Sequence, residues 1–167
     1  MVLASEALDG RTGHEAGRQL LARLYRQQTG APLPEIRVSD RGKPYFADAN
    51  WHFSISHSKT HVFCALSDRE IGIDAEEQDR EIDLRLAEKI LSPAEYARYE
   101  KARDKHLALL GLWVLKEAAA KATGEGLRGY PNHTDFSPDD PRIRLLQGHL
   151  VAVIERDEIS KEAPYVI

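Results

Sequence analysis

The sequence predicts an α+β fold with short antiparallel strands and two long helices. Two stretches place apolar residues at helical spacing, and several shorter stretches alternate apolar with polar residues. Turn residues separate most of the neighbouring alternating stretches, so the sequence lacks the strand–helix–strand rhythm of a doubly wound sheet. It also has no Gly-rich phosphate loop and no low-complexity segment.

The helices have recognisable ends. The first is predicted over residues 13–28 and ends before Gly30, and the second over residues 104–123 ends at Gly124, because glycine is the usual C-terminal stop. Between them, Ser92-Pro93-Ala94-Glu95 is typical of a helix start. Its serine is the expected N-cap, its proline the first helical residue, and its glutamate completes a capping box.

Strands are predicted wherever short alternating stretches occur. They cover residues 35–38, 51–55, 61–66, 71–76, 143–146 and 149–154. We expect the strands at 61–66 and 71–76 to form a hairpin, because only a short turn joins them. The first ten residues show little pattern.

Length and composition exclude several classes of protein. The 167 residues suffice for one compact domain or two small lobes. The 23 Lys and Arg against 27 Asp and Glu give a net charge of −4, which argues against a strongly basic nucleic-acid binder. No apolar run approaches the roughly 20 residues that span a bilayer. The single cysteine, Cys64, excludes an intrachain disulfide, and we expect it to be a small buried hydrophobe.

The strand at 71–76 carries the first candidate site. Residues two apart in a strand share a face, so Gly72, Asp74 and Glu76 lie together. We expect the glycine to leave room for a ligand beside the two carboxylates. Adjacent carboxylates repel each other unless a cation lies between them, and a hard divalent ion such as Mg²⁺ is a natural partner. The alternative is a solvated acidic face at the surface of a sheet.

The second long helix carries the next candidates. Trp113, Glu117 and Lys121 are spaced by four residues and lie close to one stripe of the helix. A functional stripe would give a third carboxylate facing Asp74 and Glu76, followed one turn later by a cation for a phosphate. The alternative is a core tryptophan beside a surface Glu–Lys pair worth a few tenths of a kcal/mol.

Two short motifs are compatible with phosphate binding. Phe53-Ser54-Ile55-Ser56-His57-Ser58 ends a strand in hydroxyls and a histidine, and Gly42-Lys43-Pro44 forms a turn with a cation. Each alone also fits an ordinary exposed turn.

In chain order, these motifs resemble the 4'-phosphopantetheinyl transferase superfamily, in particular its surfactin-synthetase-activating type. The resemblance covers residues 42–127 and extends more loosely back to the helix around Arg18. The motifs that carry it are Gly42-Lys43-Pro44, Phe53-Ser54-Ile55-Ser56-His57-Ser58, Ile71-Gly72-Ile73-Asp74-Ala75-Glu76, Ser92-Pro93-Ala94-Glu95-Tyr96, Trp113-Val114-Leu115-Lys116-Glu117-Ala118-Ala119-Ala120-Lys121 and Gly124-Glu125-Gly126-Leu127.

The resemblance implies a reaction and an architecture. The enzyme would transfer the 4'-phosphopantetheine arm of coenzyme A to a serine of an apo acyl or peptidyl carrier protein, with Mg²⁺, and release adenosine 3',5'-bisphosphate. Two small similar lobes, each a short antiparallel sheet packed on a long helix, would enclose the ligand in the cleft between them. Residues 1–77 would form the N-terminal lobe and residues 78–167 the C-terminal lobe. We expect a cytoplasmic monomer with neither nucleic acid nor membrane as partner.

The resemblance also assigns roles around the metal. Asp74, Glu76 and Glu117 match the metal-binding carboxylates of the superfamily. Glu117, directly or through a metal-bound water, is the expected general base. Lys121 matches the catalytic lysine near the phosphates, and both it and Asp74 are expected to contact coenzyme A.

Other positions match the part of the superfamily site that holds coenzyme A. Lys43, Ser56 and His57 match residues on the 3'-phosphate side. Larger members have an additional basic segment before the first helix, and here Arg11 and Arg18 are candidates to replace it. Glu95 matches a frequent acidic position near the site and is also the expected capping-box residue.

Three functions are compatible with the sequence. They are a transferase, an inactive coenzyme A- and carrier-binding relic of the same fold, and another Mg²⁺-dependent phosphate-transfer enzyme. The three carboxylates and Lys121 favour the transferase, because a relic needs no three acidic groups around one ion. A locally basic stretch is the expected carrier surface, and the alternative is a solvated helical face with mixed charges. The basic stretch comprises Arg85, Lys89, Arg98, Lys101, Arg103 and Lys105, with Leu91 and Tyr96.

Overall fold

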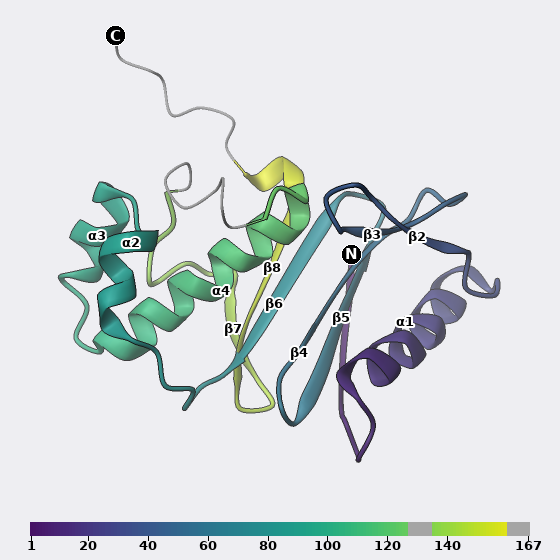
Figure 1. Ribbon diagram of the computed structural model, residues 1–167, viewed down its shortest axis with the longest axis horizontal. Helices are drawn as coiled ribbons and strands as arrows, with labels where there is room; N and C mark the ends of the chain where they lie inside the picture. Colours follow the sequence, from purple (N-terminus) through teal and green to yellow (C-terminus); the bar gives the residue numbers. More distant parts are fainter. Residues whose placement is uncertain (127–134, 160–167) are drawn as a thin grey trace, which may run out of the picture.

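The first half of the chain is a three-stranded antiparallel sheet with one helix on its outer face. The computed structural model describes residues 1–126 and 135–159. The strands, in spatial order, are β1 (Val2–Ala7), β5 (His61–Ser67) and β4 (His52–His57). Helix α1 (Gly13–Thr29) covers the sheet, and its apolar side forms a core with it (Figure 1).

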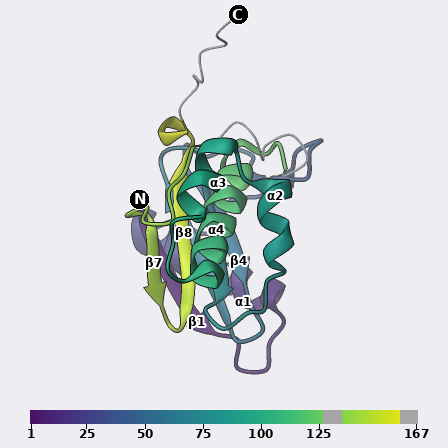
Figure 2. The same cartoon turned by 90° about the vertical axis from the view of Figure 1, so that its left-hand side faces the viewer.

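The second half repeats this design with a different order of elements. Its antiparallel sheet has the order β6 (Ile71–Glu77), β8 (His149–Glu155) and β7 (Ile143–Leu146). Helix α4 (Lys105–Thr123) covers the outer face and forms a second core with the sheet. Figure 2 looks onto this side and shows α3 and α4 in front of the strands. The two halves confirm the expected α+β architecture of two sheets, each packed on a long helix.

Smaller elements complete the chain. A two-stranded sheet of its own lies at one end of the first half. Short helices precede α4 and follow β8. These elements are β2 (Ile36–Val38), β3 (Pro44–Phe46), η1 (Leu84–Leu86), α2 (Ala87–Ile90), α3 (Pro93–Tyr99) and η3 (Arg156–Glu158). No helix within residues 1–126 or 135–159 has both the length and the apolar character needed to cross a membrane.

The inner faces of the two three-stranded sheets pack against each other. Phe63 and Ala65 of β5 form a third core with Ile73 and Ala75 of β6 and with Val151 of β8. The molecule is therefore layered as helix, sheet, sheet and helix (Figure 1). Cys64, on the opposite face of β5, is fully buried as expected, and its burial raises the pKa of the thiol to about 12.

Side-chain hydroxyls join β4 to β6, although these strands belong to different sheets. The Ser54 Oγ accepts a hydrogen bond from the Ile73 backbone N–H at 3.1 Å, and the Ser56 Oγ accepts one from the Ala75 N–H at 3.3 Å. These bonds satisfy two buried backbone donors that have no strand partner on that side. They also bring the end of β4 next to Asp74.

The predicted hairpin between residues 61–66 and 71–76 is wrong. β5 pairs with β1 and β4, whereas β6 pairs with β8. The turn after β5 carries the chain from one sheet to the other, because the apolar face of β6 packs on β5 instead of pairing with its edge. Strand β1 was also missed, because its six residues are all partly buried and give no clear alternation.

The helix ends were predicted correctly. Ser92 and Glu95 form the capping box of α3, and Gly124 ends α4 with a left-handed φ of 73°. The lobe boundary expected after residue 77 stays a prediction. In the structure, β6 comes before that boundary in the chain and hydrogen-bonds to β8 beyond it.

Gly72 is the point at which α4 lies directly on β6. A Cβ atom at this position would overlap the Ala118 carbonyl oxygen and the Ala122 backbone nitrogen, which are backbone atoms of α4. The expectation that Gly72 leaves room for a ligand is therefore wrong. The space is filled by the helix, and the missing side chain allows the close approach.

We predict that Gly72→Ala destabilises the protein by about 3 kcal/mol or more, because two backbones must separate to admit the methyl group. Chemical denaturation measures the change. Gly111→Ala is the matched control, since its Cβ would meet only the end of the Ile143 side chain, at 2.9 Å, and alanine favours helix. Equal stability of Gly72→Ala and the wild type would contradict the close contact.

Candidate active site

A pocket of about 310 Å³ lies where β4, β6 and α4 meet. Strand alternation and the helical spacing of four residues direct side chains from all three elements into it. It therefore unites most of the residues singled out in the sequence. Its lining includes Ser56, His57, Asp74, Glu76, Trp113, Glu117 and Lys121.

Asp74 is the most buried carboxylate of this pocket, with 5% of its surface exposed. Its Oδ1 accepts hydrogen bonds from Lys121 Nζ at 2.7 Å and from Ser56 Oγ at 3.1 Å. Its Oδ2 is buried and has no hydrogen-bond partner within residues 1–126 and 135–159. A buried carboxylate oxygen without a partner is costly, so this atom is a strong candidate for a cation ligand.

Glu76 and Glu117 bring two more carboxyl groups to the same pocket. Burial, and then the negative charge of Asp74, raise the pKa of both glutamates above the ordinary value. Glu76 also forms an ion pair with Arg80. The carboxylates therefore repel one another, as the sequence predicted, and extra positive charge would stabilise them.

The donor set suits a hard divalent ion. Three carboxylates and an unpartnered buried oxygen are the ligands that Mg²⁺ prefers, with room for waters and phosphates. Within the part of the chain that the structure describes, no group of three His, Cys, Asp or Glu side chains is already drawn together around one point. Lys121 and Arg80 instead each pair with one carboxylate of the cluster.

A second pocket of about 320 Å³ adjoins the first and extends it toward the β2–β3 turn. The two pockets share Ile55, Glu117 and Lys121 as lining residues. The far end of the second pocket is lined by residues of the Gly42-Lys43-Pro44 turn. Together they form an extended site that begins at the carboxylates and ends at a cation.

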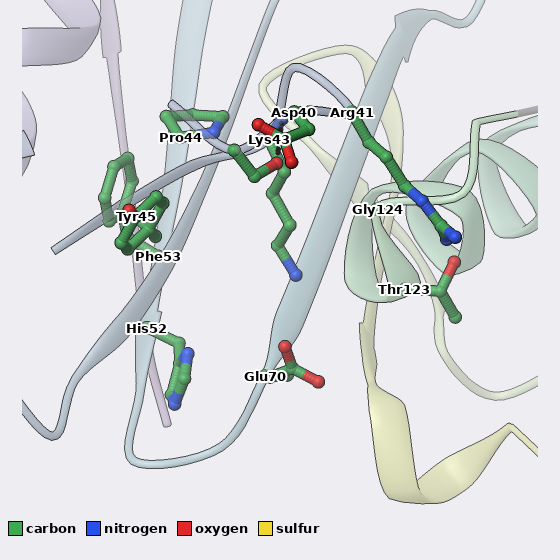
Figure 3. A pocket seen from close by; sticks show the side chains of 11 residues that line it. Asp40, Arg41, Lys43, Pro44, Tyr45, His52, Phe53, Glu70, Thr123 and Gly124 are labelled. Carbon is green, nitrogen blue, oxygen red and sulfur yellow. Dashed lines mark hydrogen bonds between the residues drawn. The ribbon is translucent and has the colours of Figure 1, made fainter. Parts of the chain in front are cut away.

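Lys43 stands between this site and a further pocket of about 440 Å³ (Figure 3). Figure 3 shows its side chain reaching toward Glu70 across that pocket. The ammonium group donates to the Ala122 carbonyl oxygen near the C-terminus of α4. Burial lowers the pKa of Lys43 below the ordinary value for lysine. Lys43 thus presents a partly desolvated cation at the end of the extended site.

Comparison with known proteins decides the family. A family model described as the 4'-phosphopantetheinyl transferase superfamily matches residues 70–163. The chain belongs to this superfamily. The matched segment contains β6, α4 and β8. Strand β6 carries Asp74 and Glu76 of the pocket, and helix α4 carries Glu117 and Lys121. The resemblance found in the sequence motifs is therefore confirmed.

Individual relatives agree. The 4'-phosphopantetheinyl transferase gsp of Aneurinibacillus migulanus is 36% identical over 115 residues, or 66% of this chain and 48% of the relative. Sfp of Bacillus subtilis (strain 168) is 35% identical over 115 residues, or 66% of this chain and 49% of the relative. AcpT of Salmonella typhimurium is 37% identical over 114 residues, or 65% and 57%. The chain spans about half the length of the curated relatives it matches.

The neighbouring motif residues Ser56 and His57 have different surroundings in this structure. His57 is exposed at the pocket, with its ring against Gly13 in the first turn of α1. The Ser56 hydroxyl faces inward instead and bonds to Asp74 and to the Ala75 N–H. Sequence reasoning assigned Ser56 to coenzyme A and missed this contact between strands, because it depends on which β-strand lies beside β4.

The arginines considered as replacements for a basic N-terminal segment lie elsewhere. Arg18 is exposed on α1 and lines neither of the two adjoining pockets. Arg11 is bound to Glu6, Gln19 and the carbonyl oxygens of Ala7 and Leu8. It holds the β1–α1 connection together and is not directed to the site.

The basic stretch expected to meet a carrier protein is partly engaged within the chain. Arg85 pairs with Asp83, and Arg98 binds Asp135 together with the Phe136 carbonyl oxygen. These contacts reduce the positive charge that the stretch offers to a partner. The carrier surface stays a prediction.

Glu95 lies outside both pockets and forms a buried ion pair with Lys116 at 2.7 Å. Both side chains are almost completely buried, and Glu95 also accepts hydrogen bonds from the Ser92 and Phe136 backbone N–H groups. The pair connects α3 and the segment at Phe136 to α4 through Lys116, which directly precedes Glu117 in the helix. The signal that could have revealed it is a lysine among the apolar residues of α4.

We predict that Lys116→Met destabilises the protein by about 3–5 kcal/mol, because Glu95 keeps its buried charge without a counter-ion. Denaturant unfolding measures the loss. Lys89→Met, at an exposed lysine, serves as the control. The double variant Glu95→Gln/Lys116→Met should recover part of the stability. If the single variant stays within about 1 kcal/mol of the wild type, the pair does not hold α3 to α4.

Proposed function

We propose that this protein transfers the 4'-phosphopantetheine arm of coenzyme A to a serine hydroxyl of an apo acyl or peptidyl carrier protein. The released product is adenosine 3',5'-bisphosphate. One observation carries the proposal: three carboxylates and Lys121 meet in one pocket that continues to Lys43. Membership of the superfamily and the printed names of its curated relatives support it.

Mg²⁺ is the proposed metal, and Asp74, Glu76 and Glu117 are its proposed ligands. When bound, the ion supplies positive charge that polarises the pyrophosphate and stabilises the leaving group. The buried Oδ2 of Asp74, which has no partner in the described residues, supports this assignment. The raised pKa values of Glu76 and Glu117 support it too, because burial and the charge of Asp74 disfavour the charged carboxylates and a cation would stabilise them.

The chain's own residues supply the remaining chemistry. Glu117 is the proposed general base and accepts the proton of the carrier serine. The serine oxygen forms a bond to the β-phosphorus, and the bond from that phosphorus to the bridging oxygen breaks. The adenosine bisphosphate leaves with the electron pair. Lys121 places its ammonium group beside the reacting phosphates.

Coenzyme A is proposed to lie along the two adjoining pockets. Lys43 and His57 would bind its phosphates through charge and hydrogen bonds. Ser56 supports the site by holding Asp74. We place the reaction in the cytoplasm and propose a monomer.

We predict that incubation with coenzyme A, Mg²⁺ and an apo carrier protein adds one phosphopantetheine to the carrier, as measured by intact mass. The gain should disappear with EDTA and with Asp74→Asn. Glu88→Gln, an exposed carboxylate away from the pocket, should leave it unchanged. Coenzyme A binding without transfer to any of several carriers would instead identify the chain as a binding relic.

We predict a separate loss for Glu117→Gln. Removing a general base should lower kcat by roughly 100-fold or more, while the Kd of coenzyme A changes only a few-fold. Single-turnover kinetics and calorimetry measure the two quantities. An equal loss of turnover and coenzyme A affinity would remove Glu117 from the role of base.

A further inference from the structure

Arg80 lies next to two residues of the carboxylate pocket and outside the sequence motifs named above. It follows β6, and its guanidinium group forms an ion pair with Glu76. The guanidinium carbon lies 5.8 Å from the centre of the Trp113 ring, a cation–π distance. Trp113 and Glu76 both line the pocket, so Arg80 lies against two of its lining residues.

The backbone at Arg80 is held in place independently of its side chain. Its N–H donates to the Glu77 carbonyl oxygen at 2.9 Å, which closes a turn directly after β6. Its carbonyl oxygen accepts a hydrogen bond from His106 Nε2, in the first turn of α4, at 2.7 Å. The side chain itself is 40% exposed. The backbone of Arg80 is therefore fixed, while its guanidinium group can move into solvent.

The balance of charges in and around the pocket explains the position of Arg80. Asp74, Glu76 and Glu117 contribute three negative charges, and Lys121 and Arg80 contribute two positive ones. Within the residues that the structure describes, Arg80 pairs with Glu76 and Lys121 pairs with Asp74.

We infer that Arg80 is a built-in counter-ion that competes with the divalent cation for Glu76 and thereby sets the metal affinity of the site. The inference rests on the proposed function, because it concerns the carboxylates assigned to Mg²⁺ there. Arg80 pairs with Oε1 of Glu76, one of the two oxygens through which this carboxylate could hold a metal ion, and two cations close together repel each other. Metal binding therefore displaces the guanidinium group of Arg80, whose side chain is more exposed than that of Lys121.

Lys121 is less suited to this exchange. Its ammonium group binds the buried Asp74 and lies 3.4 Å from the Ser56 hydroxyl, so it is held between β4 and β6. Displacing it would leave Ser56 and Asp74 without part of their network. Among the described residues, Arg80 has one ionic partner, and its side chain is 40% exposed, so its release costs less.

The test compares Arg80→Met with the wild type and with Arg69→Met. Arg69→Met removes the same charge and a surface pair with Glu155, outside the pocket. Calorimetric titration with Mg²⁺, and Mn²⁺ titration followed by electron paramagnetic resonance, measure metal affinity without turnover. We predict on the order of five-fold tighter binding by Arg80→Met, no change for Arg69→Met, and a smaller difference at high salt.

Thermal unfolding gives a second measurement. In EDTA, Arg80→Met should have a lower Tm than the wild type, because the carboxylates lose a counter-ion. Saturating Mg²⁺ should raise its Tm by more than that of the wild type, since the ion binds more tightly. Arg80→Lys, which keeps the charge, should stay close to the wild type in both measurements.

Two outcomes would overturn the inference, and they separate it from the proposed function. If wild type and Arg80→Met bind Mg²⁺ equally, or the variant binds more weakly, Arg80 is no competitor, while the metal site itself stands. If neither protein binds Mg²⁺ or Mn²⁺, the metal assignment in the proposed function fails and this inference fails with it.

Discussion

The contact between the backbone of α4 and Gly72 of β6 determines the geometry of the rest of the site. It sets the distance and the register between the strand and the helix, so Asp74, two residues further along β6, lies opposite Lys121. With that register fixed, the helical spacing of four residues places Glu117 and Trp113 in the same pocket. A side chain at position 72 would separate the strand from the helix and break this alignment.

A second constraint comes from the junction of the two halves. β4 brings Ser56 and His57 to the pocket, but it belongs to the first sheet, whereas Asp74 belongs to the second. The serine hydroxyls of β4 bond to backbone N–H groups of β6 and so connect the sheets where the pocket forms. The Ser56 hydroxyl also contacts Asp74. Ser56 therefore helps to hold the two halves together and also orients the Asp74 carboxylate.

Three carboxylates in and near the site each have a cationic partner. Glu95 has a buried lysine, Asp74 has Lys121, and Glu76 has Arg80. The first pair is sealed in the interior and holds helices together. The other two pairs lie at a pocket in which Asp74 Oδ2 has no partner among the described residues. The carboxylates of this pocket also repel one another. This contrast separates a structural ion pair from a site prepared for an additional cation.

The sequence by itself determined the long helices, their caps and most of the polar residues that meet in the pocket, because helical periodicity, capping and motif order are local properties. It failed where a choice of neighbour decides the outcome. The β5–β6 hairpin was wrong, Gly72 faces a helix, and the Ser56 hydroxyl turns to Asp74. Which strand lies beside which edge, and which cation reaches Asp74, depend on contacts between distant segments. Only the tertiary structure decided these features, because packing energy between sheets and helices has no signature in local spacing.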